Sequence, residues 1–352
     1  MAGILIYLNR ETLFEPLRGI FSKVTTTTDD DAGFPVNMPS STDYSFNELG
    51  DGFSLLTDTY LYTYNVDGVQ NFALQHGYVN SVCDTNSKRV LIYDKGGYDF
   101  ALYNRTSEIY KRSIENEVIV SAYISQNEYV AVVTSGGQYS NVVYIYNGNG
   151  QQIYVHRYLD EKVMQVGFSP DERYFYITLA KSHDGDIATK VVKYQIGESQ
   201  VWSTEIQDSI SFDLSVSDNS VMIITDEEIT CIDQASGSVT SSHGYKGTLS
   251  DYDIGEHHNV FMLESNSEKS EILVMDKNCS IIADVTVEEK VKDIKVDENG
   301  VAILTNNSVI LYDVNMVKIA DHASEDEYVQ FIKNGSALML MSGNHIDCKK
   351  YN

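Results

Sequence analysis

An internal repeat of about forty residues constrains this chain more than any other feature of its sequence. From Tyr44 onward, an apolar strand, a polar turn, a second apolar strand, another turn and a third strand recur in that order. Eight copies of the second strand can be aligned, at residues 54–57, 90–94, 130–134, 174–178, 221–225, 260–264, 301–305 and 337–341. Aligned positions from Leu56 to Leu340 are 37, 40, 44, 47, 39, 41 and 36 residues apart. Such a period, with four short strands per unit, is typical of a β-propeller.

The ends of the third strands support the same alignment. Most of them close with a tyrosine followed by Asn, Gln or Asp, as at Tyr64-Asn65 and Tyr312-Asp313. A polar residue there suits the turn that follows, because its side chain can bond to the backbone. We interpret the tyrosines as packing between neighbouring blades. The sequence therefore predicts an all-β, eight-bladed propeller, with seven blades as the alternative if one unit is degenerate.

The last repeat stops at its third strand, at Asn352. A propeller whose ring stays open would expose sheet edges, which invite aggregation. The extended segment 33–38 lies just before the first repeat, and Pro35 within it suits an outermost strand. We expect this segment to complete the eighth blade, so that residues 32–352 form one closed propeller.

Residues 1–31 have a different character. The apolar run 2–8 is too short to span a bilayer, which needs about 20 residues, but it resembles the end of a membrane anchor. Apolar residues then recur at helical spacing from Leu13 to Val24, which predicts a short amphipathic helix. The acidic stretch 25–31 resembles a flexible tether. These features predict a single-pass protein of the cell membrane with an extracytoplasmic propeller, and a soluble cytoplasmic propeller is the alternative.

Charge and cysteine content exclude some functions. The chain has 25 Lys and Arg against 51 Asp and Glu, a formal charge of −26. Nucleic-acid binding is not expected, because it needs clustered basic residues. The four cysteines, Cys83, Cys231, Cys279 and Cys348, form no C-x-x-C pair, so no metal site is expected from them. We expect Cys231 and Cys348 to be buried free thiols.

Several turns resemble those of known propeller families. The segment 168–174 is similar to the S-P-D-G-R turn of WD40-like and YVTN-like propellers. The segment 197–202, which ends at Trp202, resembles the G-x-x-x-W repeat tail of PQQ-like propellers, and 233–239 resembles a diverged copy of that turn. The whole chain resembles a family of uncharacterised bacterial proteins with a transmembrane helix and a PQQ-like propeller. The matching features are the run 3–8, the amphipathic stretch, the entry 33–35 and the first repeat at 55–59.

The resemblance implies an eight-bladed ring outside the cytoplasmic membrane, but no reaction. Quinoprotein dehydrogenases have repeated tryptophan docking positions and an adjacent cysteine pair. This chain has one Trp and no adjacent cysteines, so neither PQQ nor any other cofactor is expected. The chain also lacks the nucleophile elbow, Walker, zincin and Rossmann motifs, and no catalytic residue is predicted.

Two copies of one tripeptide are the candidate ligand-binding residues. His76-Gly77-Tyr78 ends the first repeat and His243-Gly244-Tyr245 ends the fifth. In an eight-bladed ring they would lie almost opposite each other, so His76, Tyr78, His243 and Tyr245 could flank the central channel. The alternative is a recurring turn in which glycine supplies a positive φ. The acidic pairs at 160–161 and 325–327 occupy the same class of connection and are expected to be solvated.

We therefore expect a monomeric, non-enzymatic binding or scaffold propeller. It would engage an unknown protein or glycan partner in the cell envelope through loops on one face. The alternative is a propeller enzyme, a lyase or hydrolase, that uses loop carboxylates at the channel mouth.

Overall fold

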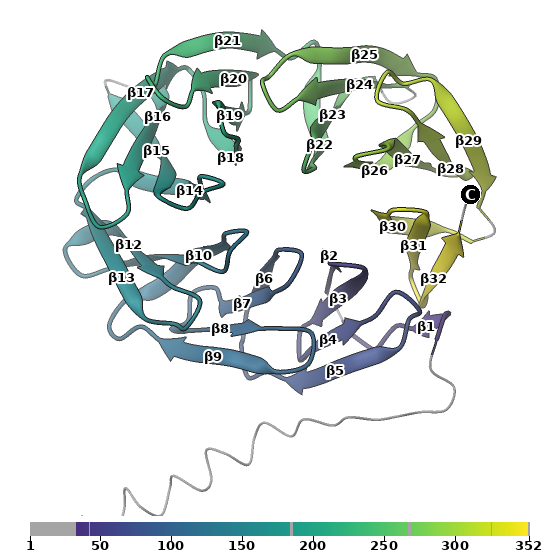
Figure 1. The fold of residues 1–352 in the computed structure, drawn as a ribbon, viewed down its shortest axis with the longest axis horizontal. Helices are drawn as coiled ribbons and strands as arrows, with labels where there is room; N and C mark the ends of the chain where they lie inside the picture. Colours follow the sequence, from purple (N-terminus) through teal and green to yellow (C-terminus); the bar gives the residue numbers. More distant parts are fainter. Residues whose placement is uncertain (1–32, 42, 184–185, 267–268, 325, 351–352) are drawn as a thin grey trace, which may run out of the picture.

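The chain folds into a closed ring of eight sheets around a central channel (Figure 1). The computed structural model describes residues 33–41, 43–183, 186–266, 269–324 and 326–350. Within these residues, the strands form eight four-stranded antiparallel sheets, one per blade. The eight-bladed prediction is confirmed, and each of the eight expected second strands is a strand of the ring.

We number the blades in chain order and the strands of each blade from the channel outward. The strands of the first four blades are β2 (Tyr44–Leu49), β3 (Gly52–Thr57), β4 (Tyr60–Tyr64) and β5 (Gln70–Gln75); β6 (Ser81–Thr85), β7 (Val90–Asp94), β8 (Asp99–Tyr103) and β9 (Glu108–Ser113); β10 (Val118–Ile124), β11 (Val130–Gly136), β12 (Tyr139–Tyr146) and β13 (Gln152–Tyr158); β14 (Lys162–Phe168), β15 (Tyr174–His183), β16 (Asp186–Gln195) and β17 (Gln200–Gln207).

The other four blades follow the same order, and the last blade takes its outer strand from the beginning of the described chain. Their strands are β18 (Ser211–Val216), β19 (Ser220–Thr225), β20 (Glu228–Asp233) and β21 (Val239–Gly244); β22 (Thr248–Ile254), β23 (His258–Asn266), β24 (Lys269–Asp276) and β25 (Ile281–Val287); β26 (Val291–Asp297), β27 (Gly300–Thr305), β28 (Ser308–Tyr312) and β29 (Lys318–Ala323); β30 (Tyr328–Asn334), β31 (Ala337–Ser342), β32 (His345–Lys350) and β1 (Val36–Asn37).

The strand order gives the ring two distinct faces. One face carries the turns between the first and second strands and between the third and fourth strands, such as residues 217–219; we call it the turn face. The opposite face carries the second-to-third hairpins and the connections from each fourth strand to the next blade, such as residues 76–80; we call it the connection face.

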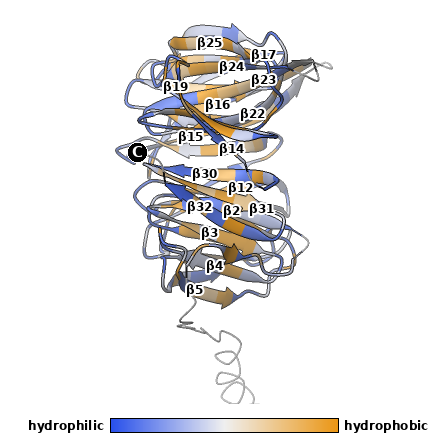
Figure 2. Ribbon diagram, turned by 90° about the vertical axis from the view of Figure 1, so that its right-hand side faces the viewer, coloured by the Kyte–Doolittle hydropathy of each residue, from blue (hydrophilic) through white to orange (hydrophobic). Residues whose placement is uncertain are grey.

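The hydrophobic core is divided among the seams between blades. Each of eight buried clusters in the described residues joins two neighbouring blades. The second strands have a blade on either side, so β3, β19, β27 and β31 are buried along their whole length. This explains their continuous apolar runs, and Figure 2 shows hydrophobic stretches along many of the strands. Tyr64, Tyr103 and Tyr146 lie in these seam clusters.

Strand β1 joins the two ends of the propeller. Val36 pairs with Ile346 and Asn37 with His345 in antiparallel register. The backbone amide of Met38 also donates to the carbonyl of Asn344, at 2.9 Å. Val36 is buried in the cluster between blades eight and one, where Phe34 and Met38 pack against it.

Aromatic residues of several outer strands dock onto the third-to-fourth turn of the next blade. Trp202 of β17 packs on Gly237, and its indole nitrogen donates to the carbonyl of Gln234 at 3.1 Å. Gly237 has a φ of +77°, and a Cβ built there would lie 2.7 Å from the indole ring. Glycine therefore serves two purposes at this turn: it adopts the left-handed conformation and it makes room for the tryptophan.

We expect Gly237→Ala to be more destabilising than Gly197→Ala, by about 1–3 kcal/mol, because only the first substitution adds overpacking against a ring. Gly197 is a matched control, since its φ is +82° and a Cβ there would meet no atom within 4 Å. Chemical unfolding of both variants measures the difference. Equal losses would show that backbone conformation alone decides the requirement for glycine.

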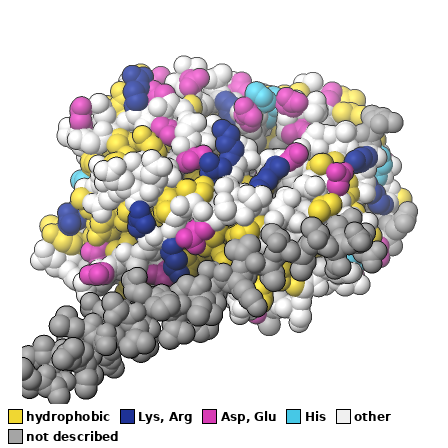
Figure 3. All heavy atoms as spheres, turned by 60° about the horizontal axis from the view of Figure 1, so that its bottom comes forward, with side chains coloured by type: hydrophobic (Ala, Val, Ile, Leu, Met, Phe, Trp, Pro, Cys, Tyr) yellow, Lys and Arg dark blue, Asp and Glu magenta, His cyan; other side chains and the backbone are white. Residues whose placement is uncertain are grey.

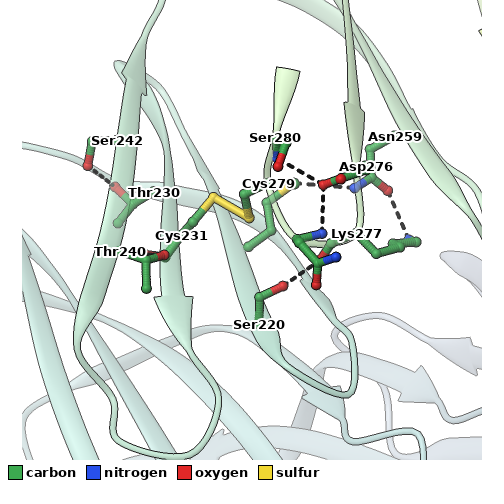
Figure 4. Close-up of a disulfide and its surroundings, with 12 residues drawn as sticks. Ser220, Thr230, Cys231, Thr240, Ser242, Asn259, Asp276, Lys277, Cys279 and Ser280 are labelled. Atoms are coloured by element: carbon green, nitrogen blue, oxygen red, sulfur yellow. Dashed lines mark hydrogen bonds between the residues drawn. A yellow bond between two sulfur atoms is a disulfide. The ribbon is translucent and has the colours of Figure 1, made fainter. Parts of the chain in front are cut away.

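A disulfide crosses the seam between blades five and six. Cys231 of β20 bonds to Cys279 in the turn after β24, with the two Cα atoms 6.2 Å apart (Figure 4). The expectation of a free thiol at Cys231 is therefore wrong, because folding brings together cysteines that lie 48 residues apart in different repeats. Cys83 and Cys348 are free, and both are half-buried.

The expected membrane anchor, amphipathic helix and acidic tether lie outside the described residues. In the part of the chain that the structure describes, we find no helix with the length and apolar character needed to cross a membrane.

Candidate functional site in the central channel

The first strands of the blades line the channel, and polar side chains on them link neighbouring blades. In blades three to eight, the pairing of the first strand with the second is interrupted by a register shift. A polar residue follows each shift: Ser121, Gln165, Asp213, Asp251, Asp293 or Gln330. Such bulges bend a strand and redirect its side chains. They give these strands a polar inner side within an otherwise apolar fold.

Side chains of the first strands hydrogen bond across every seam of the described ring. Asp84 accepts from the amide of Ile124 at 2.8 Å, Asp253 from Val296 at 2.7 Å and Asp293 from Phe331 at 2.9 Å. Five more side-chain hydrogen bonds cross the remaining seams. The donors and acceptors are Asn47 and Cys83, Tyr123 and the carbonyl of Met164, Gln165 and the carbonyl of Phe212, Tyr252 and Asp213, and Asn334 and the carbonyl of Gly50. These contacts hold the channel wall in place.

A cavity of about 420 Å³ lies in the channel between the first strands of blades two to six. Asp84 and Asp213 line it together with Tyr123 and Tyr252. Burial raises the pKa of both carboxyls to about 6, and Asp213 adds to the effect on Asp84. Removing a carboxylate from water disfavours its charge, and a cationic group that entered this cavity would favour the charged form of both carboxyls.

A second cavity, of about 720 Å³, adjoins the first at the turn face. Leu214 and Gly167 line both cavities, and residues 215–219 and 254–257 form the outer wall of the second. Lys277 also lines it, and its ammonium group donates to Asn259 at 2.9 Å. Burial lowers the pKa of Lys277 to about 8. The turn face therefore presents a polar mouth that leads to the half-buried Asp84 and Asp213.

Charged groups also gather on the first strands of blades one, six, seven and eight. The ammonium group of Lys295 lies 3.0 Å from Asp293 and 4.0 Å from Asp253. Burial opposes the charge of Lys295, but these two carboxylates hold its pKa above the usual value. Burial, followed by the nearby Asp253 and Asp297, raises the pKa of Glu48 to about 7. The channel wall is thus charged on both sides, and Lys295 offsets part of its negative charge.

The raised pKa values predict how stability changes with pH. The unfolded carboxyls release their protons near pH 4, whereas folded Asp84 and Asp213 hold theirs until about pH 6. Their contribution to stability is complete below about pH 4 and is lost as the pH rises to about 6. The double variant Asp84→Asn/Asp213→Asn should therefore gain in stability relative to wild type between pH 4 and 6. Urea unfolding across this range measures the difference, and a constant difference would contradict the prediction.

The four residues expected to bind a ligand lie in two opposite blades. His76 follows β5, and its Nε2 lies 3.1 Å from the carbonyl oxygen of Thr57. Tyr78 is buried in the cluster between blades one and two, while Tyr245 packs against the cluster between blades five and six. His243 lies in β21, opposite Ile229. Each pair belongs to its own seam, on the connection side of the ring, and none of the four lines either channel cavity. A ligand-binding role for them stays a prediction.

The channel carboxyls were missed by the sequence analysis, although a signal for them is present. The first strands at 248–254 and 291–297 carry acidic or basic residues at alternate positions, as in Asp251 and Asp253 or Asp293 and Lys295. Successive side chains of a strand point to opposite sides, so this alternation marks one polar side.

Together the ring and its acid-lined channel define the class: a closed eight-bladed β-propeller. Solved propellers share the fold at low sequence identity. BamB from Moraxella catarrhalis is 10% identical, with a TM-score of 0.55 over 90% of this chain and 100% of that one. Sqt1 from Saccharomyces cerevisiae is 10% identical, with a TM-score of 0.63 over 91% and 100%. The C-terminal WD40 domain of Sif2 is 12% identical, with a TM-score of 0.61 over 90% and 99%.

No curated protein matches the chain. A family model matches residues 28–349, and the chain therefore belongs to DUF5711, a family of unknown function.

Proposed function

We propose that this protein is a binding or scaffold propeller that acts outside the cytoplasmic membrane and receives a basic segment of a partner protein at its turn face. The observation that carries the proposal is the mouth at this face, which leads to Asp84 and Asp213. Hydrogen bonds to neighbouring strands fix both carboxyls, so they form a rigid anionic wall. A preorganised wall binds a cation without first having to be ordered.

The distribution of surface charge supports the choice of the channel. In the view of Figure 3, Lys and Arg side chains lie among Asp and Glu, and hydrophobic side chains lie between them. The net charge of −26 is therefore not gathered into one patch there. The channel wall is a better-defined anionic surface than this side of the ring, and it is the surface that we assign to the partner.

The disulfide supports a location outside the cytoplasm. Disulfides persist in oxidising compartments and are rare in the cytosol, where thiols are kept reduced. The bond between Cys231 and Cys279 is buried in the seam, where it is part of the fold. We propose that a segment preceding the propeller tethers it to the membrane. A reporter fused to the C-terminus of the full-length gene product tests the side on which the ring lies.

Crosslinking in the native envelope, followed by mass spectrometry, tests the binding proposal. We expect a basic partner to be recovered with the wild-type protein and lost with Asp218→Lys/Glu256→Lys, which reverses two exposed charges at the mouth. The matched control is Glu115→Lys/Asp160→Lys, which makes the same change in charge on the connection face. Recovery of the same partner with all three proteins, recovery of a glycan alone, or no partner would contradict the proposal.

One observation favours the enzymatic alternative. Two carboxyls with a pKa of about 6 share one cavity, and perturbed acids in a cleft are typical of acid–base catalysis. We rank it second because Asp84 accepts hydrogen bonds from two backbone amides, and Asp213 from one amide and one tyrosine. A lyase or hydrolase activity that Asp213→Asn abolishes without unfolding the ring would reverse this order.

A further inference from the structure

Three potential metal ligands converge beside the last strand of the ring. His345 and Asp347 are two residues apart in β32, so their side chains lie on the same side of the strand. Asp326 reaches them from the connection between β29 and β30. The Nε2 atom of His345 lies 2.8 Å from Oδ2 of Asp347 and 3.6 Å from Oδ2 of Asp326. One ligand atom from each residue lies within 4.8 Å of the other two.

The contacts of His345 are compatible with a tautomer in which the nitrogen that faces the carboxylates is an acceptor. Nδ1 of His345 lies 2.6 Å from the side-chain oxygen of Asn344. The hydroxyl of Ser342 also lies 3.1 Å from Nδ1. The oxygen of Asn344 only accepts, so the tautomer with its proton on Nδ1 satisfies that contact. In a neutral imidazole, Nε2 then has a free lone pair. It faces two carboxylate oxygens that also carry lone pairs, and either a proton on Nε2 or a metal ion between the three atoms satisfies this arrangement.

The spacing, hydrogen bonding and exposure of the three side chains suit a bound metal ion. Ligands on a zinc ion at about 2.0–2.2 Å are separated from one another by roughly 3–4 Å. The 3.6 Å distance from Nε2 to Asp326 lies in this range, and the 2.8 Å distance to Asp347 is slightly shorter than it. The hydroxyl of Tyr328 donates to Oδ2 of Asp347 at 2.8 Å, and hydrogen bonds of this kind orient metal ligands. The side chain of Asp326 is 52% exposed, whereas those of His345 and Asp347 are 20% and 25% exposed. An ion can therefore enter from solvent onto a partly buried site.

We propose that Asp326, His345 and Asp347 bind one Zn²⁺ ion, with water completing the coordination. An imidazole ligand favours a transition metal over Ca²⁺ or Mg²⁺, which prefer oxygen ligands alone. The ion would connect the link between blades seven and eight to β32. His345 also pairs with Asn37 of β1, so the ion would stabilise the ring beside its closure.

The test uses the untagged full chain, freed of metal with a chelator. Calorimetric titration with ZnCl₂ should show one site, and Zn²⁺ should raise the midpoint of thermal unfolding, whereas equal concentrations of Ca²⁺ or Mg²⁺ should not. His345→Gln and Asp347→Asn should each weaken Zn²⁺ binding at least tenfold. Tyr328→Phe keeps all three ligands and should weaken it by about tenfold, through loss of orientation.

The matched control is His257→Gln, an exposed histidine on the turn face that should leave Zn²⁺ binding unchanged. Titration of the wild-type protein decides the question even if a variant fails to fold. No Zn²⁺ binding by the wild-type chain would overturn the proposal and leave a hydrogen bond between His345 and Asp347. Binding that survives both ligand substitutions, or that His257→Gln weakens equally, would overturn it as well.

Discussion

Removal of the disulfide between Cys231 and Cys279 is expected to lower the free energy of unfolding by about 2–4 kcal/mol. The bond closes a loop between residues 48 apart and therefore restricts the unfolded chain. It also joins β20 to the turn after β24 inside a buried cluster. The double variant Cys231→Ala/Cys279→Ala, compared with wild type by chemical unfolding, measures the effect.

Two controls separate the bond from the loss of sulfur atoms. A reductant should bring the wild-type protein close to the double variant and leave the double variant unchanged. Cys348→Ser removes a free, half-buried thiol and should change stability far less. Equal sensitivity of the wild type and the double variant to reductant would show that the bond does not stabilise the ring.

The presence of the same disulfide in the cell can be measured by thiol alkylation. Alkylation of the denatured protein with a maleimide reagent, before any reduction, should modify two of the four cysteines, namely Cys83 and Cys348. Modification of all four would mean that the thiols are reduced in the cell, and it would remove the support that the disulfide gives to an extracytoplasmic location.

Deletion of residues 1–38 is expected to open the ring and lower the free energy of unfolding by about 3–5 kcal/mol. The deletion removes β1 and the burial of Val36, Phe34 and Met38 in the seam between blades eight and one. Each such side chain contributes about 1.5–3 kcal/mol when it is fully buried. It also exposes an unpaired edge of β32, which invites self-association. Chemical unfolding and light scattering measure the two effects.

A shorter deletion, of residues 1–32, keeps β1 and should remain monomeric and as stable as the full chain. Val36→Asp tests the same seam without a deletion, since it places a charge at a position that is only 8% exposed. If the deletion of residues 1–38 matched the shorter deletion in stability and size, the ring would not depend on its closing strand.

The blades could be predicted from the sequence because the second strand of each repeat is recognisable as an apolar run. Those strands are buried between two blades, so they keep apolar runs such as 221–225 and 301–305 in every copy. Tyrosines such as Tyr103, which close the third strands, mark where each repeat is aligned with the next. Counting the copies then predicts eight blades, with seven as the alternative if one unit were degenerate.

The channel site and the disulfide could not be found in the same way. A repeat gives the place of a residue within its blade, but it does not say which side chains meet across a seam. The pairing of Cys231 with Cys279 depends on the approach of two blades, and the contact between Asp213 and Tyr252 does so too. The repeat places His76 and His243 in opposite blades, but it does not say whether they line the channel cavities, and neither does.

The position of β1 determines how the ring can be held. It is the outermost strand of its blade, so the described chain enters at the perimeter, far from the channel axis (Figure 1). An attachment made through this strand would hold the ring at its outer edge, with the channel axis away from the point of attachment. With such an attachment, the turn face and the connection face would lie on either side of the support, and neither face would be covered by it.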